Sequence, residues 1–361
     1  LSEMVQCNRT ENQTKKEERI KIMKRIVSLV LLLCLAFSLA ACTGTTENPT
    51  TEPQRQTTAQ PTTEQEPQGE VSTPLFWKVS GNGYVGEFYL LGSIHVGTSD
   101  TNNYPEQILD AFEKCAALAV ESDIVEIEKD TAALIESMKP FVYSDGTTIK
   151  DHIDKELYDD AVALMTELGI YNFAMDYYKP TFWDSMISSM LADMSENYKI
   201  DNGVDRWFLN KAKKTNKDLI ELEDYKKTYA DEAALSDKTQ ELILERDVHG
   251  FETDDYVKEY EESIKKLFDA WKKGDLTKME EILFTEADES EYTEEEIKCA
   301  EEYNKFIMTD RNAEMVKKAL DFLKNGKSVF YVVGEAHMLG DDGLVNKLTE
   351  AGYTVELVKF D

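Results

Sequence analysis

The chain has 361 residues, of which 42% are hydrophobic, so it is long enough to bury a sizeable core. Its formal net charge of −31 at pH 7 repels nucleic acid phosphates and anionic lipid headgroups. The composition therefore argues against nucleic acid binding, and we expect no nucleic acid partner.

Residues 1–41 have the layout of an upstream extension followed by a secretory signal peptide. Met23-Lys24-Arg25 precede an apolar stretch, residues 26–41, that leads into Cys42. A helix of that length covers about 24 Å, short of the ~30 Å hydrocarbon core, so a permanent membrane span is the weaker interpretation. The L-A-A-C end resembles the bacterial lipobox, which predicts lipidation of Cys42 and an extracytoplasmic domain anchored to the bacterial cell membrane.

Residues 42–73 are rich in Thr, Gln, Glu and Pro and hold almost no large apolar side chain. Such a segment cannot offset the entropy of ordering, so it is predicted to be a disordered tether, with the folded domain at residues 74–361. Within that domain Cys115 and Cys299 are too few for a disulfide framework, and either one bridge or two buried thiols fit.

The domain opens with a predicted hairpin. Residues 75–95 form two apolar strands joined by Ser80-Gly81-Asn82-Gly83. A helix is expected after Tyr104-Pro105, as far as Cys115, and residues 117–120 form a short strand that ends on Glu121.

The centre of the domain is predicted to be mostly helical. Residues 149–216 form several amphipathic helices, residues 218–223 form a strand, and residues 225–323 are charged and helical, with breaks at Gly250 and Gly274. The chain then returns to a strand, a helix and a strand, at residues 329–333, 343–351 and 353–358. The predicted fold is α/β (α+β): a central mixed β-sheet built from two β-α-β halves, with a helical insertion at approximately 125–325.

Two segments far apart in the chain share one pattern. GSIHVG, containing His95, and GEAHMLG, containing His337, each follow an apolar strand, and in each the histidine comes three residues after a glycine. One histidine after an apolar strand is more often a core residue. Because two of the chain's four histidines share this context, we favour a common functional site.

Polar side chains close the predicted strands at the edge where open α/β sheets build their sites: His95, Glu121, Glu221 or Glu223, and His337. Two imidazoles with one or two carboxylates suit a divalent transition metal, which acidifies bound water and polarises a carbonyl. A carboxylate outside the metal shell, Glu121 or Glu223, is then the candidate general base.

Three further groups of residues carry weaker expectations. Arg311 and Asn312 are candidates to stabilise an oxyanion or orient a ligand, although a surface ion pair is the default interpretation of Asp310-Arg311. His152 and His249 are predicted to be solvated positions at helix ends. No G-x-S-x-G, Walker loop, dinucleotide fingerprint, H-E-x-x-H or C-x-x-C cluster is present, so those enzyme classes lose support.

At these motifs the chain resembles the TraB/GumN family, which is related to the Tiki metalloproteases and more remotely to erythromycin esterase and the haem-associated ChaN proteins. The resemblance covers residues 74–361 in order. Its motifs are LLGSIHVG at 90–97, LAVESDI at 118–124, GVDRWFLNKA at 203–212, LIELE at 219–223, DRN at 310–312 and VVGEAHMLGDDGL at 332–344.

The resemblance implies a metal-dependent hydrolytic site, with proteolysis and the use of Mn or Co attributed to the Tiki branch. Zn is a further candidate metal. The resemblance implies His95, His337 and Glu121 as metal ligands. Carried over residue by residue, the expected catalytic residues are Glu121, Glu223, Arg311 and Asn312, with Asp205 expected to bind substrate. Glu335 is a further candidate for substrate binding that the resemblance does not supply. The chain departs from the family pattern at Glu335, where many relatives have a small or apolar residue, and at Lys226-Lys227.

Two hypotheses of function follow. The first is a surface-anchored, metal-dependent hydrolase that is peptidase-like and acts on a peptide or a small molecule. The alternative is a non-catalytic lipoprotein that binds a peptide, metal or haem in the same cleft. A third interpretation, in which both histidines are structural core residues, predicts only a loss of stability when they are replaced.

Overall fold

The computed structural model describes residues 69–251, 253, 255–284 and 292–360. The predicted signal peptide, most of the predicted tether and Cys42 lie outside this part of the chain. Within it, no helix is both long enough and apolar enough to cross a membrane.

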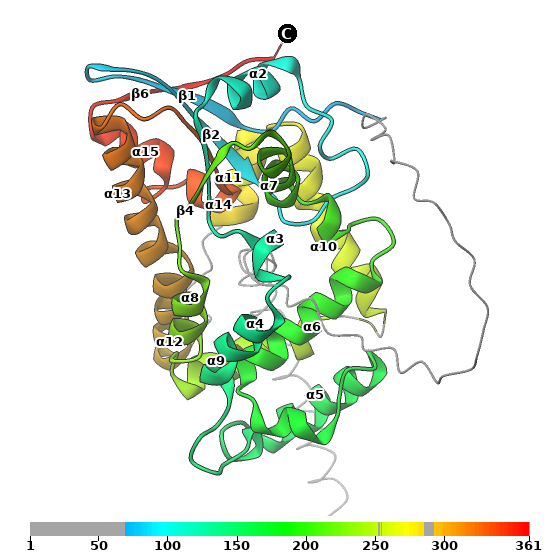
Figure 1. Cartoon of the computed structure of the whole chain (residues 1–361). Coiled ribbons are helices and arrows are strands. Elements are labelled where there is room, and N and C mark those ends of the chain that lie inside the picture. The colour runs from blue at the N-terminus through cyan, green and yellow to red at the C-terminus, as the bar shows by residue number, and fades with distance from the viewer. Residues whose placement is uncertain (1–68, 252, 254, 285–291, 361) are drawn as a thin grey trace, which may run out of the picture.

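A six-stranded mixed sheet forms the centre of the domain, in the order β4-β3-β5-β2-β1-β6 (Figure 1). The strands β2, β5, β3 and β4 run parallel, and β1 is antiparallel to both of its neighbours, β2 and β6. The prediction of an α/β fold with a mixed sheet is confirmed. The strand bounds are β1 Phe76–Gly81, β2 Tyr84–Ser93, β3 Ala117–Val120, β4 Asp218–Glu221, β5 Val329–Gly334 and β6 Thr354–Leu357.

The predicted hairpin is present as β1 and β2. Gly81, Asn82 and Gly83 all have positive φ, at 85°, 51° and 78°, which is the left-handed region that tight hairpin turns require. Strand β5 lies between β3 and β2, and each of its six residues is buried. Burial on both faces explains why its sequence is a continuous apolar run instead of an alternating one.

The two glycine-histidine motifs leave the sheet at neighbouring positions. Strands β2 and β5 pair in parallel, with Gly92 opposite Val333 and Ser93 opposite Gly334. Because the carboxyl ends of parallel strands meet at one edge, both motifs begin there, as predicted from the recurrence.

Helices cover the sheet and continue beyond it. In Figure 1, α4, α5, α6 and α9 gather below the sheet, while α2, α7, α13 and α15 lie beside it. The bounds are α2 Glu106–Lys114, α3 Ile124–Ile127, α4 Thr131–Ser137, α5 Lys155–Glu167, α6 Pro180–Met194, α7 Val204–Thr215, α8 Tyr225–Glu232, α9 Asp237–His249, α10 Tyr256–Lys272, α11 Leu276–Phe284, α12 Glu294–Asn304, α13 Asp310–Lys324, α14 Glu335–Met338 and α15 Leu344–Glu350.

Two of these helices, α7 and α13, carry site residues. Their apolar faces pack against the sheet and so hold these residues in place. On α7, Asp205 shares the buried face with Phe208, whose ring centroid lies 5.0 Å from that of Phe330 on β5. On α13, the buried face includes Arg311 and Met315, and the Met315 carbonyl accepts a hydrogen bond from the Tyr331 hydroxyl at 2.9 Å.

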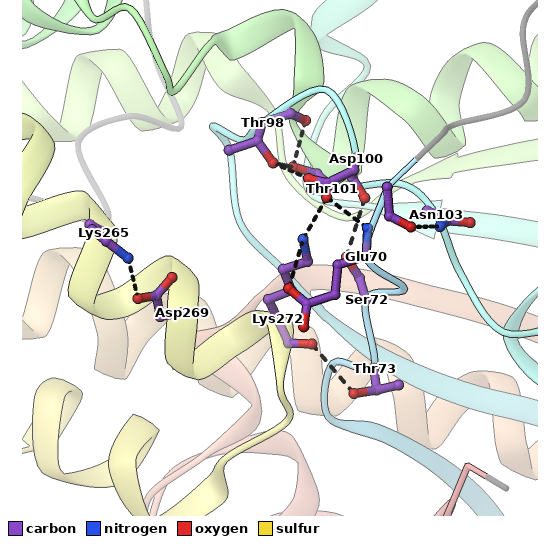
Figure 2. Close-up of polar contacts among 11 residues, drawn as sticks. Glu70, Ser72, Thr73, Thr98, Asp100, Thr101, Asn103, Lys265, Asp269 and Lys272 are labelled. Carbon is purple, nitrogen blue, oxygen red and sulfur yellow. Dashed lines mark hydrogen bonds and ion pairs between the residues drawn. The ribbon is translucent and has the colours of Figure 1, made fainter.

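The start of the described chain is fastened to the loop that follows His95 (Figure 2). The Ser72 N–H donates to the Asn103 carbonyl at 2.8 Å, and the Thr73 N–H donates to the Lys272 carbonyl at 2.8 Å. The Lys272 ammonium donates to Asp100 Oδ2, also at 2.8 Å. Residues 69–73, which the sequence assigned to the tether, therefore hold this loop against the end of α10.

Candidate functional site

The predicted site residues converge around Gly334, the last residue of β5. A Cβ atom built on this glycine would lie 3.4 Å from Glu121 Oε1, 3.5 Å from His337 Cδ2 and 3.9 Å from His95 Nε2. Both imidazoles and one carboxylate thus lie within 4 Å of a single point, although His337 is more than 200 residues from His95 and Glu121 in the sequence.

His95 is held by a carboxylate on its far side. It lies just beyond β2, its side chain is 12% exposed, and its Nδ1 is 2.7 Å from Asp205 Oδ2. An ionised carboxylate only accepts hydrogen bonds, so Nδ1 carries a proton and Nε2 faces Gly334. Burial alone would lower the pKa of His95, but the charge and hydrogen bond of Asp205 outweigh it and the pKa is raised.

His337 is held in the same manner by an amide. It lies in the short helix α14, is fully buried, and has its Nδ1 2.6 Å from Asn312 Oδ1. Its Nε2 is buried and has no hydrogen-bond partner among the described residues. Burial and then the nearby Arg311 lower the pKa of His337 to about 3, so its imidazole is neutral. The sequence predicted the histidine but not the helix that carries it.

Glu121 contacts both the end of β5 and the buried Arg311. It directly follows β3, and its Oε1 accepts the Gly334 N–H at 2.7 Å and lies 4.0 Å from His337 Nε2. Its Oε2 accepts from Arg311 Nη2 at 2.6 Å. Burial would raise its pKa, but Arg311 and then the two histidines outweigh burial and hold the pKa of Glu121 well below its usual range.

Glu223 is the second carboxylate bound by Arg311. It accepts from Arg311 Nε at 2.7 Å and from Nη2 at 2.8 Å, a two-point contact. Burial raises its pKa despite the guanidinium. Of the two glutamates left open by the sequence, the structure brings Glu223 to the site, whereas Glu221 is an exposed residue that accepts the Asp123 N–H at 3.0 Å.

The interpretation of Arg311 as a surface residue is wrong. Its side chain is 9% exposed, and it pairs with Glu121 and Glu223, while its neighbour Asp310 contacts Lys305. A π-helical turn, Lys305–Thr309, directly precedes α13, and such turns recur at functional sites. No spacing in the sequence reveals a buried arginine between two distant glutamates.

The side chain of Glu335 explains why the first glycine-histidine motif begins with a glycine, Gly92. Glu335 is 5% exposed, and a Cβ atom at Gly92 would stand under 3.0 Å from its carboxylate, so only glycine leaves it this space. In the part of the chain that the structure describes, neither carboxylate oxygen has a hydrogen-bond partner, and burial raises the pKa of Glu335 to about 8. Gly92 thus makes room for Glu335, whereas a Cβ atom at Gly334 would be in ordinary van der Waals contact with Glu121 and the histidines.

Asp205 and Asn312 contact the two histidines from behind. Asp205 also accepts the Ser93 hydroxyl at 2.8 Å, a contact that the sequence analysis did not foresee. The contacts of Asp205 thus orient an imidazole, and the expectation that Asp205 and Glu335 bind substrate stays a prediction. Both imidazoles have their Nδ1 committed and their Nε2 directed inward, which is how metal-binding histidines are oriented by their outer partners.

The remaining histidines and cysteines lie in ordinary structural environments. His152 and His249 lie at helix ends, as predicted. Their side chains are only partly solvated, at 19% and 15% exposed, and each contacts a carboxylate. Cys115 and Cys299 are free and buried. The two-thiol alternative therefore holds.

The donor chemistry around Gly334 fits a divalent transition metal, with His337 Nε2 as an unpartnered buried nitrogen. As the side chains stand, however, no group of three or more His, Cys, Asp or Glu in the described ranges is arranged to hold a metal ion. Glu121 is engaged by Arg311 and Gly334, so the structure presents two imidazoles and an already hydrogen-bonded carboxylate near one point.

A comparison with protein families decides the relationship. The sequence pattern of the TraB/PrgY/gumN family matches residues 75–357, which span the whole sheet and every residue of the site. The chain belongs to the TraB/PrgY/gumN family. No curated protein and no solved structure matches it.

Proposed function

We propose that this TraB/PrgY/gumN domain is a metal-dependent hydrolase, peptidase-like in its chemistry. The observation that carries the proposal is the pair of Nε2 atoms. His95 Nε2 lies 3.9 Å from the Cβ position of Gly334, and His337 Nε2 is buried there without a partner. A buried neutral nitrogen that lacks a hydrogen bond is costly, and a ligand that binds it removes the cost.

In this proposal His95, His337 and Glu121 hold the metal, with Mn, Co or Zn as candidates. A bound divalent metal supplies acidified water and a polarised carbonyl. Asp205 and Asn312 keep both Nδ1 atoms protonated, so each ring in its neutral form offers its Nε2 lone pair.

Arg311 and Glu223 form the charged wall of the proposed site. The guanidinium holds Glu121 and Glu223 through hydrogen bonds of 2.6 to 2.8 Å, which fixes both carboxylates and reduces their mutual repulsion. Because burial raises the pKa of Glu223, this carboxyl is the better suited of the two to take up and release a proton. We assign Glu223 the role of general base.

Attachment to the membrane through lipidated Cys42 is part of the same proposal. It would place the domain outside the cytoplasm on a tether. It is supported by the apolar segment and the L-A-A-C end of the sequence.

The test combines metal binding with turnover. Purified protein is titrated calorimetrically with Mn²⁺, Co²⁺ and Zn²⁺, and peptide libraries are incubated with and without each metal and analysed by mass spectrometry. His95→Ala and His337→Ala are expected to lose metal binding and cleavage together. His249→Ala is the matched control, because His249 is similarly buried and also contacts an aspartate, Asp160, at 2.8 Å.

Metal-stimulated cleavage that survives in His95→Ala would contradict the proposal. Metal or peptide binding without turnover by the wild type would instead support the non-catalytic alternative. Loss of stability without any ligand binding would point to two structural histidines.

A further inference from the structure

Ser93 is buried behind His95 and makes one specific contact. Its hydroxyl donates to Asp205 Oδ1 at 2.8 Å, while Asp205 Oδ2 contacts His95 Nδ1 at 2.7 Å. Ser93 and Asp205 are 3% and 6% exposed. We propose that Ser93 is a positioning residue that fixes the Asp205 carboxylate and, through it, the ring of His95. Its effect on metal binding rests on the proposed function, whereas its effect on His95 does not.

The backbone around this array is already fixed on both sides. The Val204 N–H, at the start of α7, donates to the Ile94 carbonyl at 3.0 Å. Gly203 packs so closely that a Cβ atom there would stand under 3.0 Å from the His95 carbonyl oxygen. The helix bearing Asp205 is therefore locked to the segment bearing His95, and the main remaining freedom is rotation of the Asp205 carboxylate.

The Ser93 hydroxyl removes that freedom. The terminal torsion of an aspartate is broad and roughly two-fold, so backbone placement alone does not fix the carboxylate plane. A hydroxyl that donates to Oδ1 holds the plane in which Oδ2 meets the imidazole N–H. A carboxylate that turned away would no longer hold the Nδ1 proton, and Nε2 would lose its orientation toward Gly334.

The same geometry argues against a nucleophilic role for Ser93. An activated serine donates its proton to an imidazole, whereas this hydroxyl donates to the carboxylate behind the imidazole. Ser93 thus acts on His95 only through Asp205.

Ser122 provides a matched control. It also lies at the sheet edge, one residue after Glu121, and is 7% exposed, but its hydroxyl has no hydrogen-bond partner within the described ranges. Ser122→Ala therefore removes the same atoms from a similarly buried place without releasing a carboxylate.

The experiment records imidazole ¹H–¹⁵N spectra of the metal-free full chain labelled at its four histidines. The His95 Nδ1 proton is expected as a downfield signal that moves upfield or broadens in Ser93→Ala and stays in place in Ser122→Ala. The weaker thiol donor of Ser93→Cys gives an intermediate shift. Zn²⁺ affinity falls about 10-fold in Ser93→Ala, the low end of what outer partners of metal ligands contribute.

A double-mutant cycle shows whether the effect passes through Asp205. In an Asp205→Asn background, Ser93→Ala is expected to add no further loss of Zn²⁺ affinity and no further shift. An unchanged His95 signal in Ser93→Ala, an equal change in Ser122→Ala, or an independent loss in the Asp205→Asn background would each overturn the proposal. A wild type that binds no Zn²⁺ would refute the proposed function, while the spectra would still decide the role of Ser93.

Discussion

Replacing Arg311 with alanine removes the positive charge that two buried carboxylates share. The side chains of Glu121 and Glu223 are each 10% exposed, and Arg311 contacts both at 2.6 to 2.8 Å. Without the guanidinium, both carboxylates keep the cost of leaving water and lose the attraction that offsets it.

The expected loss of folding stability in Arg311→Ala is large because the charged cluster of Arg311, Glu121 and Glu223 is buried. Removing one partner of a buried ion pair destabilises by about 3–5 kcal/mol, and here one arginine serves two carboxylates. Arg206→Ala is the matched control. Arg206 also forms a two-point contact, but with Glu128, whose side chain is 30% exposed, so the expected cost is about 1 kcal/mol or less.

The loss of stability in Arg311→Ala depends on pH, and the environment of the two glutamates determines the direction of this dependence. In the wild type the pKa of Glu121 is lowered, so its contribution to stability is present above the unfolded pKa and is lost as the pH falls. In Arg311→Ala burial dominates, and the pKa of each carboxyl rises above its unfolded value. Each carboxyl then costs stability as the pH rises, so the deficit of the variant is greater near pH 8 than near pH 4.

Urea unfolding monitored by circular dichroism measures the deficit at both pH values. Adding Glu121→Gln and Glu223→Gln to Arg311→Ala is expected to restore much of the stability at neutral pH, because no buried charge remains. A deficit equal to that of Arg206→Ala, or one independent of pH, would refute the description of a buried charge cluster.

Three further outcomes are expected. Gly92→Ala lowers the free energy of unfolding by about 1–3 kcal/mol because its methyl group meets the Glu335 carboxylate. Adding Glu335→Ala recovers most of this lost stability. Equal urea midpoints for the single and the double variant would contradict the close packing of Gly92 against Glu335. In the metal-free protein the pKa of His337 is lowered to about 3, so its NMR signals show no titration near the usual histidine pKa of about 6.5. Because the unfolded chain takes up this proton and the folded protein does not, the free energy of unfolding falls as the pH drops below about 6.5. Cys42→Ser abolishes metabolic labelling with an alkyne fatty acid, and a labelled variant would rule out that anchor.

Much of the fold follows from local patterns in the sequence. The apolar runs that end at Ser93, Val120 and Gly334 are strands, and the turn at Gly81-Asn82-Gly83 is the predicted hairpin. These features depend on neighbouring residues, so periodicity and turn residues reveal them. The recurrence of glycine and histidine also indicated, correctly, that the two strands end side by side.

The partners of the site residues could not be predicted in the same way. Arg311 reaches Glu121, 190 residues away, and Asp205 reaches His95, 110 residues away, through the packing of α13 and α7 on the sheet. An isolated Asp-Arg sequence, or a serine shortly before a histidine, also occurs at many surface-exposed positions, so neither pattern indicates burial. Only the three-dimensional packing shows that Arg311 is buried between glutamates and that Ser93 faces a carboxylate.

The most direct test of the account is anomalous diffraction from crystals of the wild-type domain soaked in Zn²⁺ or Mn²⁺. We expect one strong peak beside Gly334, for Zn²⁺ about 2.0–2.1 Å from the Nε2 atoms of His95 and His337, with both Nδ1 atoms still bound to Asp205 and Asn312. Crystals that show no peak there, or a peak held by other residues while His337 Nε2 stays unpartnered, would contradict this expectation.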